Sequence, residues 1–143
     1  MKEFFLILFF GKSVLLTPMP VTLEDEVALV PKEPLSAITI GANLEIDVTH
    51  IIKWAQEEEG ILEFRDRVRK RFPPQSIKAR LIQKTGNEIT LSYDGLMQFN
   101  NKSTLLSLYG EKGVPIDREF YKVIITSNIK INDVLVHWKN HTY

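Results

Sequence analysis

The segment IKARLIQKTGNEITLSY, residues 77–93, decides the fold class of this chain. Two runs rich in Ile and Leu, residues 77–83 and 88–93, flank a turn-forming Thr-Gly-Asn sequence at 85–87. Short apolar runs separated by Gly and Asn predict two antiparallel strands joined by a hairpin. The segment therefore predicts a β-rich domain, and the neighbouring sequence repeats the pattern.

Asp94-Gly95 follows this segment directly and is a strong signal for a two-residue hairpin turn. A tight turn there would place Tyr93 opposite Leu96 and leave apolar and polar side chains mixed on both faces of the hairpin. A bulge, a bend or a sheet buried on both sides fits these residues better than an ideal hairpin.

Further strands are predicted on both sides of the opening segment. Residues 44–49 alternate between apolar and polar types, which is typical of a half-buried strand. Residues 104–109, 120–127 and 134–138 also read as strands, with a turn over 128–133. Turn signals recur about every 8–12 residues, and this spacing predicts a mainly β fold, an antiparallel β-sandwich.

Residues 50–72 are the exception, and they predict one amphipathic helical insertion in the sandwich. The apolar residues recur at helical spacing: Ile61, Phe64, Val68 and Phe72. We expect a helix over about 61–71, ended by Pro73-Pro74 because a residue before proline avoids the α conformation. A shorter helix over 50–58, ended at Gly60, is compatible with the preceding residues.

The chain has 143 residues with 18 basic and 18 acidic side chains, but its charge is unevenly distributed. The first sixty residues carry a net charge of −6 and the remainder carries +6. The candidate binding residues are the bases of the expected helix: Arg65, Arg67, Arg69, Lys70 and Arg71. They could form a partner-binding surface. Alternatively, they form a solvated face that pairs with the acidic run at 57–59.

Residues 1–20 form an apolar N-terminal segment, and residues 21–143 are expected to form a single β-sandwich domain. The run Phe4–Phe10 is compatible with a signal peptide or with a first strand, and it is too short to span a bilayer. A signal peptide would make the protein periplasmic or secreted, whereas a retained segment would place it in the cytoplasm.

The residue types that carry chemistry give mostly negative predictions. The chain has no cysteine, which removes disulfides, thiolate catalysis and cysteine-based metal sites. The three histidines, His50, His137 and His141, do not have metal-ligand spacing, and no serine lies in a setting typical of a nucleophile. We therefore predict no catalytic residue, no metal and no cofactor.

These observations favour a non-catalytic binding module that contacts another protein, exported if the N-terminal segment is a signal peptide. Overall neutrality argues against a nucleic-acid partner. One alternative is a structural subunit that lends its apolar N-terminal segment to an assembly. A less favoured alternative is a hydrolase built from turn carboxylates and His50, and the oligomeric state is left open.

Overall fold

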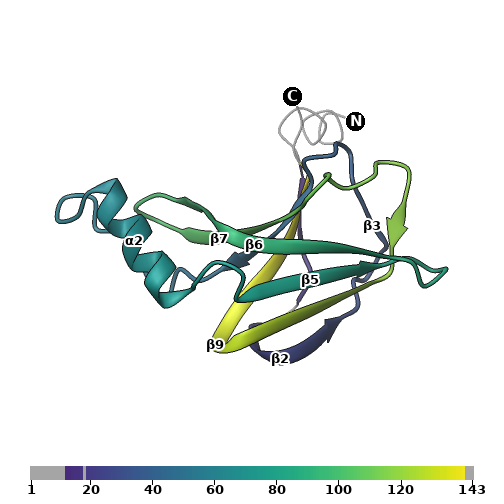
Figure 1. The fold of residues 1–143 in the computed structure, drawn as a ribbon, viewed down its shortest axis with the longest axis horizontal. Helices are drawn as coiled ribbons and strands as arrows, with labels where there is room; N and C mark the ends of the chain where they lie inside the picture. Colours follow the sequence, from purple (N-terminus) through teal and green to yellow (C-terminus); the bar gives the residue numbers. More distant parts are fainter. Residues whose placement is uncertain (1–11, 18, 141–143) are drawn as a thin grey trace.

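The computed structural model describes residues 12–17 and 19–140, and this part of the chain is mainly antiparallel β-sheet (Figure 1). The strands are β1 (Lys12–Leu15), β2 (Val21–Leu29), β3 (Leu35–Ser36), β4 (Asn43–Asp47), β5 (Ile77–Ile82), β6 (Glu88–Phe99), β7 (Thr104–Gly110), β8 (Glu119–Phe120) and β9 (Lys122–Asn140). Within the described ranges the only helix is α2 (Ile61–Arg71). The mainly β prediction is confirmed, whereas the run Phe4–Phe10, considered as a signal peptide or a first strand, lies outside the described residues.

Five strands close into a barrel in the order β9–β4–β7–β6–β5 and back to β9. Closure depends on β9, because its residues 135–139 pair with β4 and its residues 122–127 pair with β5. The sandwich prediction was therefore only partly right. The sequence predicted the short antiparallel strands, but closing the sheet on itself removes free edges within the ring, which two stacked sheets would leave open.

The predicted turn over 128–133 is wrong, because β9 runs as one bent strand through these residues. Strand β2 follows the bend, with shifts in its pairing register around Leu23. Asp25 and Asp133 take positive φ angles of 52° and 54° where the two strands bend. Exposed polar residues at such a bend resemble a turn in the sequence, which explains the error.

Residues 88–99 form one continuous strand, so Asp94-Gly95 is not a hairpin turn. The pairing with β7 shifts between Tyr93 and Met97, and Gly95 has a φ of 90°. The bulge that the mixed faces suggested is therefore confirmed. The first hairpin is also confirmed, since Gln83 N donates to Asn87 O at 2.8 Å between β5 and β6.

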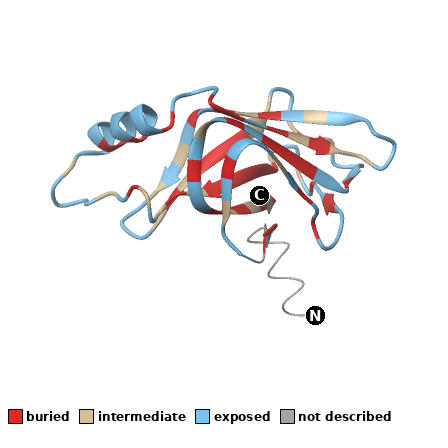
Figure 2. Ribbon diagram, turned by 90° about the horizontal axis from the view of Figure 1, so that it is seen from below, coloured by how far each residue is buried: buried red, intermediate tan, exposed pale blue. Residues whose placement is uncertain are grey.

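The hydrophobic core fills the barrel and extends beneath its attached segments (Figure 2). Its largest fully buried side chains include Trp138, Tyr93, Phe64, Phe72 and Phe120. Trp138 also fastens the β3–β8 pair to the barrel, because its indole Nε1 donates to Ser36 O at 3.0 Å. The inward residues of β4, Leu44 and Ile46, pack in the same core.

The helix α2 lies at one end of the molecule and packs on it through Phe64 and Val68 (Figures 1 and 2). The shorter helix considered over 50–58 is not formed, since this segment makes isolated turns such as Glu58 N to Ala55 O at 2.9 Å. The side chain of Trp54 packs edge-on against Phe99, with ring centroids 5.1 Å apart. This packing holds the segment extended against the barrel.

Candidate functional site

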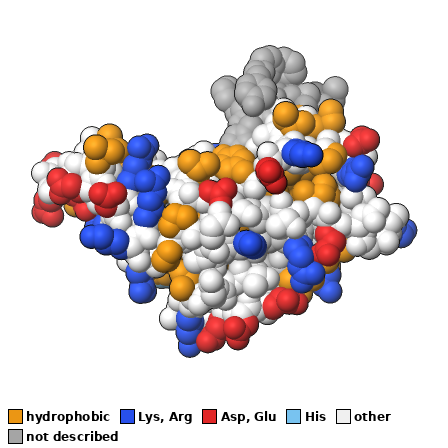
Figure 3. Space-filling model, viewed as in Figure 1, with side chains coloured by type: hydrophobic (Ala, Val, Ile, Leu, Met, Phe, Trp, Pro, Cys, Tyr) orange, Lys and Arg blue, Asp and Glu red, His pale blue; other side chains and the backbone are white. Residues whose placement is uncertain are grey.

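The five predicted binding residues all lie on α2, and all five are exposed. Figure 3 shows basic side chains gathered in a blue column at the end of the molecule where α2 lies, beside a group of acidic side chains. Five bases against the acids Glu63 and Asp66 give the helix a net charge of +3. Some of these five side chains contact other residues of the same chain, and others do not.

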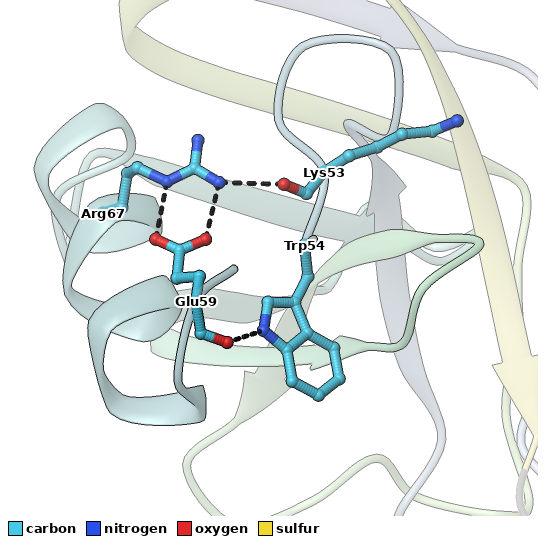
Figure 4. Close-up of polar contacts among 4 residues, drawn as sticks. All are labelled: Lys53, Trp54, Glu59 and Arg67. Carbon is cyan, nitrogen blue, oxygen red and sulfur yellow. Dashed lines mark hydrogen bonds and ion pairs between the residues drawn. The ribbon is translucent and has the colours of Figure 1, made fainter. Parts of the chain in front are cut away.

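Arg67 is bound within the chain (Figure 4). Its Nε donates to Glu59 Oε2 at 3.0 Å and its Nη2 donates to Glu59 Oε1 at 2.9 Å. The same Nη2 donates to Lys53 O at 2.8 Å, and Trp54 Nε1 donates to Glu59 O at 2.9 Å. Arg67 therefore ties the loop before α2 to the helix.

This bidentate contact moves the pKa values of both Glu59 and Arg67 further from pH 7. Hydrogen bonds from Arg67 lower the pKa of the Glu59 carboxyl, and the same contact raises the pKa of Arg67. The alternative in which the basic stretch pairs with the acidic run at 57–59 is thus correct for Arg67. This side chain has a local structural role.

Arg69 and Arg71 also have contacts inside the chain. Arg69 Nε donates to Gly95 O at 3.2 Å, and a Cβ added at Gly95 would come within 3.1 Å of that nitrogen. The Arg71 guanidinium lies 5.9 Å from the ring centre of Phe72. Below them, the buried Tyr93 hydroxyl donates to Phe72 O at 2.9 Å. Burial raises the pKa of Tyr93 to about 12, so the hydroxyl remains a donor at neutral pH.

The side chains of Arg65 and Lys70 make no hydrogen bond or ion pair with any described residue. Leu62, three residues before Arg65 on the same helix face, is 71% exposed, and Ile61 is 51% exposed. The solvent-facing side of α2 therefore carries the exposed Leu62 with Arg65 on one flank and Lys70 on the other, about 140° apart around the helix, and the acidic Asp66 lies between Leu62 and Lys70. Sequence periodicity could not separate these two cations from Arg67, because all three lie off the apolar line of the helix.

The less favoured hydrolase would depend on His50 and on carboxylates at turns. His50 is exposed, and its Nε2 donates to Asn132 O at 3.0 Å. This bond links β9 to the start of the 48–60 segment, the stretch between β4 and α2. No group of three or more His, Asp or Glu side chains in residues 12–17 and 19–140 is arranged to hold a metal ion. His141 lies outside the described residues.

The sequence reading missed a polar row across the barrel wall. Glu45 on β4 pairs in register with Ser107 on β7 and with His137 on β9. Glu45 is only 3% exposed, although the alternating pattern predicted a half-buried strand with this residue on the polar side. Its nearest cation is Lys139, at 3.8 Å. The prediction was wrong because Ser107 of β7 and His137 of β9 flank Glu45 on the same face of the sheet, and alternation within one strand does not show what flanks it.

Burial raises the pKa of Glu45, and the nearby Lys139 only partly opposes this effect. Burial also lowers the pKa of His137, against the opposing charge of Asp47. Each environment therefore disfavours the charged form of its side chain, although no ligand-binding geometry follows from this row.

We expect Glu45→Gln to stabilise the protein at pH 7. Because the folded-state pKa of Glu45 is raised, the folded state holds its proton more tightly than the unfolded state does. Stability is therefore lost as the pH rises from the unfolded pKa through the folded pKa. The substitution should raise the Tm at pH 7 by about 3 °C, which for a domain of this size corresponds to about 1 kcal/mol in the free energy of unfolding. At pH 4 the rise in Tm should be smaller.

Thermal melts followed by circular dichroism at both pH values measure this difference. The control is Glu24→Gln on β2, because Glu24 is exposed. A lower Tm for Glu45→Gln at pH 7 would show that the pairing with Lys139 outweighs the cost of burying the carboxylate.

Comparison of the chain with protein-family models, curated proteins and solved structures finds no match. Among the described residues, no helix has the length and apolar character needed to cross a membrane.

Proposed function

We propose that this protein is a non-catalytic binding module and that the outward face of α2 contacts an acidic surface of a partner protein. The observation that carries the proposal is the pair of unpaired cations, Arg65 and Lys70, on the solvent-facing side of α2, with the exposed Leu62 one turn before Arg65. An apolar anchor surrounded by charges matches the usual anatomy of a transient interface. The charges speed and orient the encounter, and the anchor is desolvated on contact.

The arginines that contact other residues of the chain also support this proposal. Arg67 fixes the middle of α2 to the preceding loop, and Arg69, two residues further on, fixes it to the bulge at Gly95. A helix held at two points presents its outer face with little freedom to move, which lowers the entropic cost of binding. The five bases thus divide into those that position the helix and those that meet the partner.

The test compares the full chain with the double variant Arg65→Glu/Lys70→Glu. A photo-crosslinking amino acid at position 62 in living cells should capture one acidic partner, identified by mass spectrometry. The purified partner should then bind the unchanged chain at least about tenfold more tightly than the double variant, because each reversal turns attraction into repulsion. The Tm should fall by about 3 °C or less, since neither side chain has a partner within the described chain and the main loss is the favourable placement of Lys70 in the last turn of the helix.

Lys84→Glu, on the exposed turn between β5 and β6, is the matched control and should bind like the unchanged chain. Anionic phospholipid vesicles provide the competing test. Equal affinity of the double variant for the partner would contradict the proposal. Vesicle binding that the double variant loses, without any captured protein, would also contradict it.

A further inference from the structure

The first two turns of α2 carry opposite charges on their two flanks. Side chains turn by about 100° per residue around a helix, so Glu63 and Arg65 lie about 160° apart. Leu62 lies between them on the exposed side, while Phe64 and Val68 are buried on the opposite side. This part of the helix therefore presents an acidic flank, an apolar centre and a basic flank.

The acidic flank continues into the loop before the helix. Arg67 lies about 40° from Glu63 around the helix, and it holds Glu59 of this loop in its bidentate contact. Glu57 and Glu58 belong to the same loop and are exposed. Their side chains and that of Glu63 make no hydrogen bond or ion pair with any described residue. Because Glu59 neutralises Arg67, unpaired negative charge remains on this flank.

The basic flank lies on the other side of Leu62. Arg65 and Arg69 are about 40° apart there. Arg69 Nε donates to an uncharged backbone carbonyl, so this contact does not neutralise its guanidinium. Lys70 lies nearly in line with Glu63 but about 10 Å further along the axis, beyond the first two turns. The blue column beside the red group in Figure 3 reflects this separation of charge.

A surface divided in this way is complementary to itself. In a two-fold dimer every contact occurs twice, because the same patch of both copies meets. A two-fold axis that runs along α2 through Leu62 would set the acidic flank of each copy against the basic flank of the other. The two Leu62 side chains would meet at the axis, and Glu63 of each copy would face Arg65 of the other. A uniformly acidic protein would instead be repelled by the carboxylates.

From this complementarity we propose that the acidic surface met by the basic flank belongs to a second copy of this chain. The inference rests on the proposed function, because it uses the same outward side of α2 and names its partner. Leu62, 71% exposed, and Ile61, 51% exposed, supply the apolar contact, and the flanking charges set the pairing as they do in coiled coils. Two helical turns and a loop bury less than the roughly 1,200 Å² of a standard interface, so the dimer is weak.

The test is sedimentation equilibrium of the full chain from about 10 µM to about 1 mM at low salt, where a weak dimer is detected. The unchanged chain should pass from monomer to dimer over this range. Arg65→Glu and Glu63→Lys should each weaken the dimer at least about tenfold, because each sets like charges opposite one another. Lys84→Glu, on the exposed turn between β5 and β6, is the matched control and should dimerise like the unchanged chain.

Mixing the two variants separates lost contacts from lost folding. In the heterodimer, the introduced glutamate at position 65 faces the introduced lysine at position 63, and the native Glu63 and Arg65 face each other in the second contact. The equimolar mixture and the combined variant Glu63→Lys/Arg65→Glu should therefore dimerise like the unchanged chain. A variant that had merely unfolded would not be rescued by mixing.

The inference is overturned if the chain stays monomeric up to about 1 mM, or if the mixed variants associate no better than each alone. Crosslinking at position 62 distinguishes these failures from failure of the proposed function. Capture of a different protein by a monomeric chain would overturn the second copy alone. Capture of no protein by a monomeric chain would overturn both proposals.

Discussion

Replacing Trp138 by alanine should lower the free energy of unfolding by about 3–5 kcal/mol, the usual cost of deleting a large buried aromatic side chain. The indole is 1% exposed, and its ring centre lies 6.4 Å from that of Phe120. Trp138 lies on β9 between its partners Leu44 of β4 and Val14 of β1. The cavity would therefore open where the barrel closes, and the hydrogen bond to Ser36 O would be lost.

Urea denaturation followed by far-ultraviolet circular dichroism measures this loss. A domain is typically stable by about 5–15 kcal/mol, so the variant should be partly unfolded at 37 °C if the protein lies near the lower end of that range. Trp138→Phe is the matched control and should cost about 1–2 kcal/mol, because it keeps most of the volume but not the donor. A loss below 1 kcal/mol for Trp138→Ala would contradict the packing described for β9.

Phe64→Ala should have the second largest effect, a loss of about 3–5 kcal/mol that acts first on α2. Phe64 is fully buried, and its ring centre lies 4.7 Å from that of Phe99 and 6.4 Å from that of Trp54. These rings join α2, the 48–60 segment and the end of β6. Without Phe64 the helix retains Val68 as its only buried residue.

The measurements are denaturation together with limited trypsin digestion, because α2 carries five potential cleavage sites. Cleavage within 61–71 should become rapid while the barrel strands remain protected, since exposed, locally unfolded segments are cut first. Leu62→Ala is the control and should change stability by less than about 0.5 kcal/mol, because Leu62 is 71% exposed. Slow cleavage of Phe64→Ala would show that the polar contacts of Arg67 and Arg69 hold the helix without the aromatic cluster.

The helix shows how far sequence reasoning reaches at the candidate site. The spacing of Phe64, Val68 and the two prolines at 73–74 predicted its bounds correctly, because periodicity and proline are local signals. The same sequence could not tell which arginine is bound. Arg67 is hydrogen-bonded to Glu59, eight residues away in the sequence. Arg69 is hydrogen-bonded to Gly95, which is 26 residues away on strand β6.

The pairing of β2 with β9 and the loop at Gln75 lie further beyond sequence reasoning. Asp25 and Ser127 are about one hundred positions apart in the chain and meet only because β2 pairs with β9. Gln75 resembled an ordinary loop residue, and its positive φ depends on its bond to Tyr93 O across the bulge. No local pattern marks either residue.

The sequence by itself determined a cysteine-free, mainly antiparallel β chain with one basic amphipathic helix, because strand alternation, helical spacing and turn residues act over short distances. Only the tertiary structure decided that the sheet closes into a barrel, that Glu45 is buried, and that Arg65 and Lys70 are free while Arg67 is bound. Each of these depends on which distant strand or loop lies alongside. The long, bent β9 sets that arrangement by pairing with four other strands.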